Sequence, residues 1–126
     1  MLDESKGGAK VWYIPDGYLP AKKGAGAMES HEALMLLNVN SQPANVKMDI
    51  YFEDREPEMN LAFRVDAQRI KCIRMDHLDG IGAISLPRLT QYSLRIRSDV
   101  NLVVQFGRLD VTQPNLAYYG CMAYSE

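Results

Sequence analysis

A histidine and a glutamate stand side by side at the start of the most apolar stretch of the chain. His31 and Glu32 follow Ser30 and lead directly into five consecutive apolar residues, 33–37. An imidazole and a carboxylate can both hydrogen-bond a hydroxyl-bearing ligand, and the carboxylate can fix the imidazole tautomer. Neighbouring strand residues point to opposite faces, so both side chains enter one pocket only if the strand is distorted. The alternative is structural: His31 bonds a neighbouring loop, and Glu32 is solvated or paired.

Polar side chains also stand at the end of a second apolar run, 100–106. If the two apolar runs form neighbouring strands, their polar ends converge, and two aromatic residues from the first part of the chain could stack on a sugar ring. We therefore predict a small-molecule, carbohydrate-like binding site made of Trp12, Tyr18, His31, Glu32, Gln105, Arg108 and Asp110. The alternative for Arg108 is a structural ion pair with Asp110, two residues away.

The same residue types raise the question of catalysis or of a bound metal ion. The side chains with metal-ligand groups are His31, Glu32, Asp76, His77 and Asp79. Their spacing matches no regular zinc pattern, and 76–80 lacks the further ligands of a calcium loop. Neither cysteine has a histidine at a telling spacing, and no Gly-x-Ser-x-Gly motif occurs. The sequence disfavours an enzyme and predicts no catalytic residue, cofactor or metal; a metal-assisted enzyme is the remote alternative.

The elements that must position these groups are short strands. The run 33–37 has no polar face and therefore needs cover on both sides, in a sandwich core or in a subunit interface. A polar turn follows at 40–45, and alternation over 46–53 predicts a second strand. Two strands joined by a short polar turn predict a hairpin.

The rest of the chain is punctuated at regular intervals. Turns are expected at 15–17 and 98–99, one helical turn at 76–80 and a long loop at 81–90. The alternation changes phase over 69–75, which predicts a β-bulge near 72–73. About eight short strands without an amphipathic helix predict an all-β fold, an antiparallel β-sandwich.

Composition is that of an ordinary globular protein. Hydrophobic residues make up 47% and charged residues 24%, which argues against long disorder. We expect a flexible N-terminal segment at 1–10 and a single domain at 11–126. The start lacks the apolar stretch of a signal peptide, and no later run could span a bilayer, so we expect a cytoplasmic protein without membrane insertion. Cys72 and Cys121 are expected to be buried free thiols.

Charge allows a second kind of function. Fourteen basic and sixteen acidic residues give a net charge of -2, so no overall field draws the protein to phosphate or anionic lipid. By alternation Arg64, Arg95 and Arg97 lie on outward faces, and Lys22 and Lys23 lie in a loop. An oligomer would multiply such a patch, so an interaction protein that contacts a receptor or DNA is the alternative to a ligand sensor. Solvated strand faces that oppose edge pairing are the structural alternative.

The order of several short motifs resembles a known family. They are Trp12, Gly17-Tyr18 with Pro20, Ser30-His31-Glu32 leading to Leu37-Asn38, Ile50-Tyr51-Phe52 with Pro57, Arg69, and Val103-Val104-Gln105 with Arg108-Leu109-Asp110. The colinear set, from about Trp12 to Tyr124, resembles the sensory rhodopsin transducer family. The resemblance implies a cytosolic β-sandwich of jelly-roll or carbohydrate-binding-module type that assembles as a homotetramer.

The resemblance also implies a role in signal relay. For the cyanobacterial member it implies coupling to a photoreceptor and a link to DNA binding. The loop at 22–24 and the segment at 81–90 depart from the cyanobacterial pattern, so the partners stay open.

Overall fold

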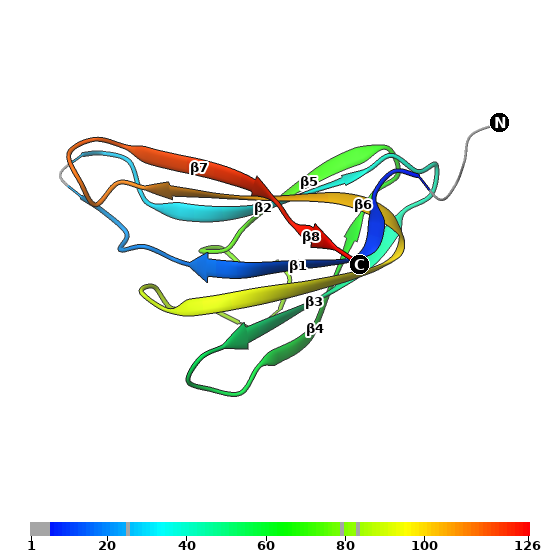
Figure 1. The fold of residues 1–126 in the computed structure, drawn as a ribbon, viewed down its shortest axis with the longest axis horizontal. Helices are drawn as coiled ribbons and strands as arrows, with labels where there is room; N and C mark the ends of the chain where they lie inside the picture. The colour runs from blue at the N-terminus through cyan, green and yellow to red at the C-terminus, as the bar shows by residue number, and fades with distance from the viewer. Residues whose placement is uncertain (1–5, 25, 79, 83) are drawn as a thin grey trace.

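The chain folds into two layers of antiparallel strands that share one long strand. The computed structural model describes residues 6–24, 26–78, 80–82 and 84–126. The strands of this part are β1 (Ala9–Tyr18), β2 (His31–Asn38), β3 (Ala44–Phe52), β4 (Glu58–Val65), β5 (Arg69–Arg74), β6 (Gln91–Asp110), β7 (Ala117–Met122) and β8 (Tyr124–Ser125). The first layer has the order β4-β3-β6-β1-β8, and the second has the order β5-β2-β6-β7 (Figure 1). The all-β sandwich expected from the sequence is confirmed.

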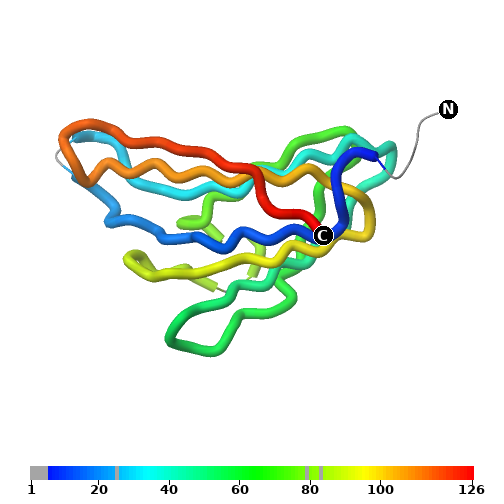
Figure 2. Tube along the Cα trace, viewed as in Figure 1, coloured from blue at the N-terminus to red at the C-terminus, as the bar shows by residue number. Residues whose placement is uncertain are grey.

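Strand β6 holds the two layers together. Its first part pairs with β3 as far as Ser98 and with β1 as far as Leu102, and its last part, from Val103, pairs with β2 and β7. Figure 2 shows the chain doubling back between these parts, where yellow passes into orange. The change of direction expected at 98–99 is therefore present, but as a bend inside a continuous strand and not as a turn between two strands. Asp99 marks the bend, because its carboxylate accepts hydrogen bonds from Asn45 of β3.

The core lies between the layers and comes from alternate positions of the strands. It includes Trp12, Ile14, Leu34, Leu36, Val46, Met48, Ile50, Leu94, Ile96, Leu102, Val104 and Phe106. The alternation predicted for 46–52 is confirmed, since Val46, Met48 and Ile50 are all buried. In β2, Leu34 and Leu36 enter the core, whereas Leu37 faces outward and is exposed. One side of the apolar run is thus covered by the chain itself, and the other side is not.

The predicted hairpin of β2 with β3 is wrong, because these strands belong to different layers. β2 pairs with β5 and β6, while β3 pairs with β4 and β6. The buried side chain of Asn38 fixes the crossing between the layers. Its amide donates hydrogen bonds to the backbone oxygens of Gln42, Val65 and Asp66.

The predicted bulge at 72–73 is also wrong. The register of β5 with β2 runs without a shift from Arg74 opposite Ala33 to Arg69 opposite Asn38. The phase change in the sequence has another cause: Ile70 and Cys72 point outward, and Ile73 points into the core, so both faces of β5 carry apolar residues.

Two further predicted turns, at 15–17 and at 76–80, differ from expectation or lie partly outside the described residues. The segment 15–17 stays within β1, where the register with β6 shifts between Ile14 and Gly17, so it is a bulge. A Cβ at Gly17 would lie 2.5 Å from the Tyr92 ring, which explains the glycine. Of the helical turn expected at 76–80, Asp79 lies outside the described residues; 75–78 form a turn and extended chain, and the described residues of 81–90 form the expected loop.

The N-terminal boundary and the cysteines also differ from expectation. β1 begins at Ala9, so the first strand starts two residues before the expected domain boundary. Cys72 and Cys121 are free, as expected, but both are exposed, so their predicted burial is wrong. Cys72 lies on the outer side of the second layer, and Cys121 belongs to β7, whose residues are all exposed. Within the described ranges, no helix has the length and apolarity needed to cross a membrane.

Candidate functional site

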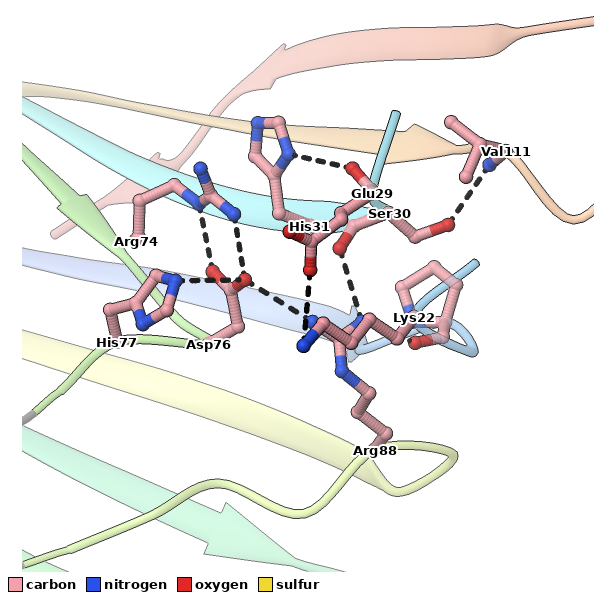
Figure 3. Close-up of polar contacts among 10 residues, drawn as sticks. Lys22, Glu29, Ser30, His31, Arg74, Asp76, His77, Arg88 and Val111 are labelled. Atoms are coloured by element: carbon pink, nitrogen blue, oxygen red, sulfur yellow. Dashed lines mark hydrogen bonds and ion pairs between the residues drawn. The ribbon is translucent and has the colours of Figure 1, made fainter. Parts of the chain in front are cut away.

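His31 and Glu32 lie on opposite sides of the second layer. Glu32 is fully buried between the layers, opposite Arg108 of β6. His31 lies on the outer side, where its Nδ1 is 3.3 Å from the backbone oxygen of Glu29 (Figure 3). The strand is regular here, so the two side chains do not share a pocket.

The carboxylate of Glu32 joins the two layers. It accepts hydrogen bonds from Arg108 Nε at 2.8 Å, from Tyr92 Oη at 2.6 Å and from the backbone N–H of Tyr18 at 3.1 Å. Tyr18 and Tyr92 come from strands of the first layer, and Glu32 and Arg108 from strands of the second. Each carboxylate oxygen is therefore held by a donor from the first layer.

Burial and charge keep the Tyr92 phenol and the Arg108 guanidinium protonated. Burial raises the pKa of Tyr92, and the negative charge of Glu32 raises it further, so the phenol stays protonated and donates. Burial alone would lower the pKa of Arg108, but the hydrogen bond to Glu32 and the charges of Glu32 and its neighbours together raise that pKa. The guanidinium also lies 5.2 Å from the ring centroid of Tyr119, and Nη2 lies 3.7 Å from Asp16 Oδ1. We call Asp16, Glu32, Tyr92, Arg108 and Tyr119 the Glu32 cluster.

A second group of charges lies close by, beyond the start of β2 (Figure 3). Asp76 accepts two hydrogen bonds from Arg74, at 2.7 and 2.8 Å, and one from Arg88 at 3.2 Å. Its side chain is almost fully buried, and His77 Nε2 lies 3.6 Å from the same carboxylate. Burial would raise the pKa of Asp76, but the hydrogen bonds and the positive charge of Arg74, with smaller contributions from its surroundings, together lower it. Arg88 also donates to the backbone oxygens of Pro20 and Ser30, so the group joins four segments of chain.

The Asp76 group is a poor acid–base catalyst at neutral pH. A carboxylate that already accepts charge-assisted bonds from arginine has little tendency to take up a proton. Asp76 is held in this way by Arg74 and Arg88. Among the described residues, no group of three or more His, Cys, Asp or Glu side chains could hold a metal ion.

The other residues of the predicted ligand site lie elsewhere. The indole of Trp12 is 7% exposed and donates to the backbone oxygens of Ala9 and Leu102, at the end of β1 away from Tyr18. Gln105 is exposed on the outer side of the second layer. Asp110 accepts hydrogen bonds from Thr112, in a local turn.

The structure thus brings together only part of the predicted set. Glu32, Arg108 and the backbone of Tyr18 meet, and the anticipated Arg108–Asp110 pair is replaced by the pair of Arg108 with Glu32. Sequence reasoning missed Tyr92, Asp16 and Tyr119 because they come from three other strand regions. Gly17 was a usable signal for Tyr92, because the Tyr92 ring packs where a side chain at position 17 would lie.

The outer side of the second layer forms a continuous apolar surface. In register, Ile70, Leu37 and Val103 form one row across β5, β2 and β6. The next row holds Cys72, Met35, Gln105 and Met122 and extends the surface to β7. Ile70 is 66% exposed, Tyr118 65% and Met122 58%. We call this surface, with Met35, Leu37, Ile70, Cys72, Val103, Tyr118 and Met122, the apolar face.

Comparison with known proteins gives one family and two related structures. The family described as Anabaena sensory rhodopsin transducer matches residues 7–125. A crystal structure of Thermotoga maritima 1070 is 30% identical, with a TM-score of 0.81, and the match covers 96% of this chain and 97% of that one. The Anabaena sensory rhodopsin transducer is also 30% identical, with a TM-score of 0.65, over 79% of this chain and 95% of its own. None of the curated proteins compared matches the chain.

Proposed function

The chain belongs to the Anabaena sensory rhodopsin transducer family, and we propose that it relays a signal through binding surfaces and not through catalysis. The observation that carries this proposal is the apolar face, which spans four strands and is uncovered within the chain. Contiguous exposed apolar surface marks interaction sites in globular proteins. The arginine-paired carboxylates support the second half of the proposal, because Asp76 and Glu32 are each already bonded to arginine.

The first partner in this proposal is a second copy of the chain. The rows that contain Ile70 and Cys72 have no charged side chain, and Arg74 in the next row is paired with Asp76, so two copies can meet there without burying unpaired charge. One self-complementary surface produces a dimer, and a closed tetramer needs a second contact. The proposed homotetramer therefore uses the apolar face for one of its two interfaces.

The second partner is a sensory receptor. This part of the proposal comes from the name of the related Anabaena protein, a sensory rhodopsin transducer. Signal relay of this kind takes place on the cytoplasmic side of a membrane receptor. Two exposed free thiols, Cys72 and Cys121, suit that reducing compartment.

A small-molecule ligand at the Glu32 cluster is the second candidate function. Its supporting observation is Arg108, whose side chain is 17% exposed and whose Nη2 has no hydrogen-bond partner among the described residues. Tyr119 lies over the same guanidinium and is itself exposed. An aromatic ring beside an incompletely bonded arginine suits a hydroxyl-rich ligand such as a sugar.

The test of the proposed function combines mass and receptor binding. Light scattering of the purified full chain is expected to give four times the 14.2 kDa of one chain. A detergent-solubilised Anabaena sensory rhodopsin is expected to be retained on immobilised protein, whereas a duplex DNA is not. A monomeric protein that retains no rhodopsin would overturn the proposal, and retention of DNA alone would replace the receptor by nucleic acid.

A further inference from the structure

The outer side of the first layer contains a buried carboxylate. Asp49 points outward from β3, yet its side chain is fully covered. Its oxygens accept hydrogen bonds from Arg95 Nε, Arg97 Nη2 and the backbone N–H of Asn60, each at 2.9 Å. Burial would raise the pKa of Asp49, but the bonds from Asn60, Arg95 and Arg97 together lower it. One negative charge thus holds two positive charges, and one cation is left in excess.

The two arginines are held in fixed positions. Arg97 Nη2 also donates to Asn60 Oδ1 at 2.7 Å, and Arg95 lies 6.0 Å from the ring centroid of Tyr51. Asn60 has a φ of 60°, in the left-handed region that non-glycine residues seldom adopt, beside a shift in the β3–β4 register. This backbone turns both the N–H and the side chain of Asn60 toward the Asp49 group. Because the guanidinium groups are already oriented, little entropy is lost when an anion binds them.

A hollow lies next to Arg97 on the same layer. Its volume is about 540 Å³, and it is lined by residues 45–47 of β3, 62–64 of β4 and 97–99 of β6. Three of the lining residues are cations: Lys47, directly opposite Arg97 in the register, Arg97 itself, and Arg64 on β4. Ala62 lies opposite Lys47 in the register, and its small side chain leaves space among the three cations. The volume falls in the range of small-ligand sites, roughly 300–1,000 Å³.

Lys47 and Arg64 are open to solvent beside the hollow, whereas Arg97 shares its positive charge with Asp49. Asp99, the acid of the lining, is bonded to Asn45. Arg64 pairs with Asp66, but both side chains are mostly exposed, and such pairs are weak in water. Arg97 Nε is buried and has no hydrogen-bond partner among the described residues. The lining therefore combines three cations with one acid that is already bonded.

We propose that this hollow binds the phosphate group of a small phosphorylated metabolite, of the size of a sugar phosphate or a nucleoside monophosphate. Lys47, Arg64 and Arg97 would hold the phosphate, since ammonium and guanidinium groups form short charge-assisted bonds to phosphate oxygens. Ala62 and the methylene stems of Lys47 and Arg64 would contact the rest of the ligand. A nucleic acid needs a track of cations along its backbone, and this protein carries a net charge of -2 with one compact cluster. The site lies on the layer opposite the apolar face and goes beyond the proposed function.

The test is a titration of the full chain followed by amide NMR shifts and by calorimetry. The probes are glucose 6-phosphate and AMP, each compared with its uncharged parent, glucose or adenosine. Only the phosphorylated probes are expected to bind, and the shifts are expected to cluster at 45–47, 62–64 and 97–99. Lys47→Gln and Arg64→Gln should each weaken binding about tenfold, the usual effect of losing one charged hydrogen-bond donor. Arg69→Gln, an equal loss of charge on the exposed edge of the other layer, should change nothing.

Several results would overturn the proposal. They are no saturable binding of either phosphorylated probe up to about 10 mM, equal binding of the uncharged parents, shifts outside the hollow, or unchanged binding by the Lys47 variant. A duplex DNA that binds more tightly than AMP and depends on the same residues would assign the surface to nucleic acid. The proposed function is judged separately by mass and receptor binding, so failure of one leaves the other standing.

Discussion

The two outer sides of the sandwich obey the same alternation and have opposite chemistry. On the second layer the outward positions of β5, β2 and β6 carry Ile70, Leu37 and Val103 in one row. On the first layer the outward positions of β3 and β6 carry Asp49 opposite Arg95, with further cations beside them. The outer side of the first layer pairs Asp49 within the chain but leaves cations in excess, whereas the outer side of the second layer exposes apolar surface that water does not stabilise. In our proposals the apolar side therefore meets a second copy of the chain, and the charged side binds a small anion.

The largest effect is expected from the carboxylate that joins the layers. Glu32→Ala removes the partner of buried Arg108 and of the Tyr92 phenol, and should lower the free energy of unfolding by about 3–5 kcal/mol. Urea unfolding followed by tryptophan fluorescence measures it, because Trp12 is in the core. A loss below about 1 kcal/mol would show that the Glu32 cluster does not connect the two sides.

The next effect concerns the charged side. Asp49→Ala leaves Arg95 and Arg97 without their shared acceptor and should cost about 2 kcal/mol of unfolding free energy, measured in the same way. Asp99→Ala, which removes an exposed carboxylate from the same layer, is the matched control and should cost less. If the two variants lose the same free energy of unfolding, the burial of Asp49 adds nothing to the stability of the fold.

The charged side and the Asp76 group beside β5 should both respond to acid. The pKa of Asp49 and that of Asp76 lie below the ordinary value of 3.8, so each carboxylate stabilises the fold fully above that pH. Their contribution is lost as pH falls through the folded-state pKa, because the unfolded chain takes up protons first. Urea midpoints measured between pH 6 and pH 2 should fall most steeply below about 4. Asp49→Asn should flatten that fall, and an unchanged slope would contradict the assignment.

The smallest effect on stability is expected from the exposed cation of the hollow. Arg64→Gln breaks a pair with Asp66 that is open to solvent, and should change the free energy of unfolding by less than about 0.5 kcal/mol. Thermal unfolding of the variant beside the native chain measures it. A larger loss would mean that Arg64 has a structural role and would weaken its use as a probe of ligand binding.

The sequence predicted those parts of the fold that depend on local pattern. Val46, Met48 and Ile50 alternate with polar residues, and a half-buried strand leaves that period of two in its sequence. Strand pairing could not be predicted in this way, because β2 and β3 are neighbours in sequence but lie in different layers. The bend at Asp99 has the same polar residues as a turn, although the strand continues through it.

The candidate site was predicted in part, and for a physical reason. Glu32 and Arg108 stand at the ends of the two most apolar runs, and those runs are indeed paired, so the two residues meet. Tyr92 reaches Glu32 from the other layer, across a separation of 60 residues that no local pattern encodes. Trp12 carries the residue type of a sugar-stacking surface, but its place in the core depends on the packing of both layers.

The contrast between the two sides is tested most directly by the oligomeric mass of a variant with a substitution in the apolar face. Ile70→Lys introduces a charge at the most exposed aliphatic position, with Lys47→Gln on the other layer as the control. Sedimentation of the native chain and of the control should give the tetramer, and Ile70→Lys should give a smaller species with an unchanged circular dichroism spectrum. A native chain that sediments at 14.2 kDa, or an Ile70→Lys variant that remains tetrameric, would contradict the account.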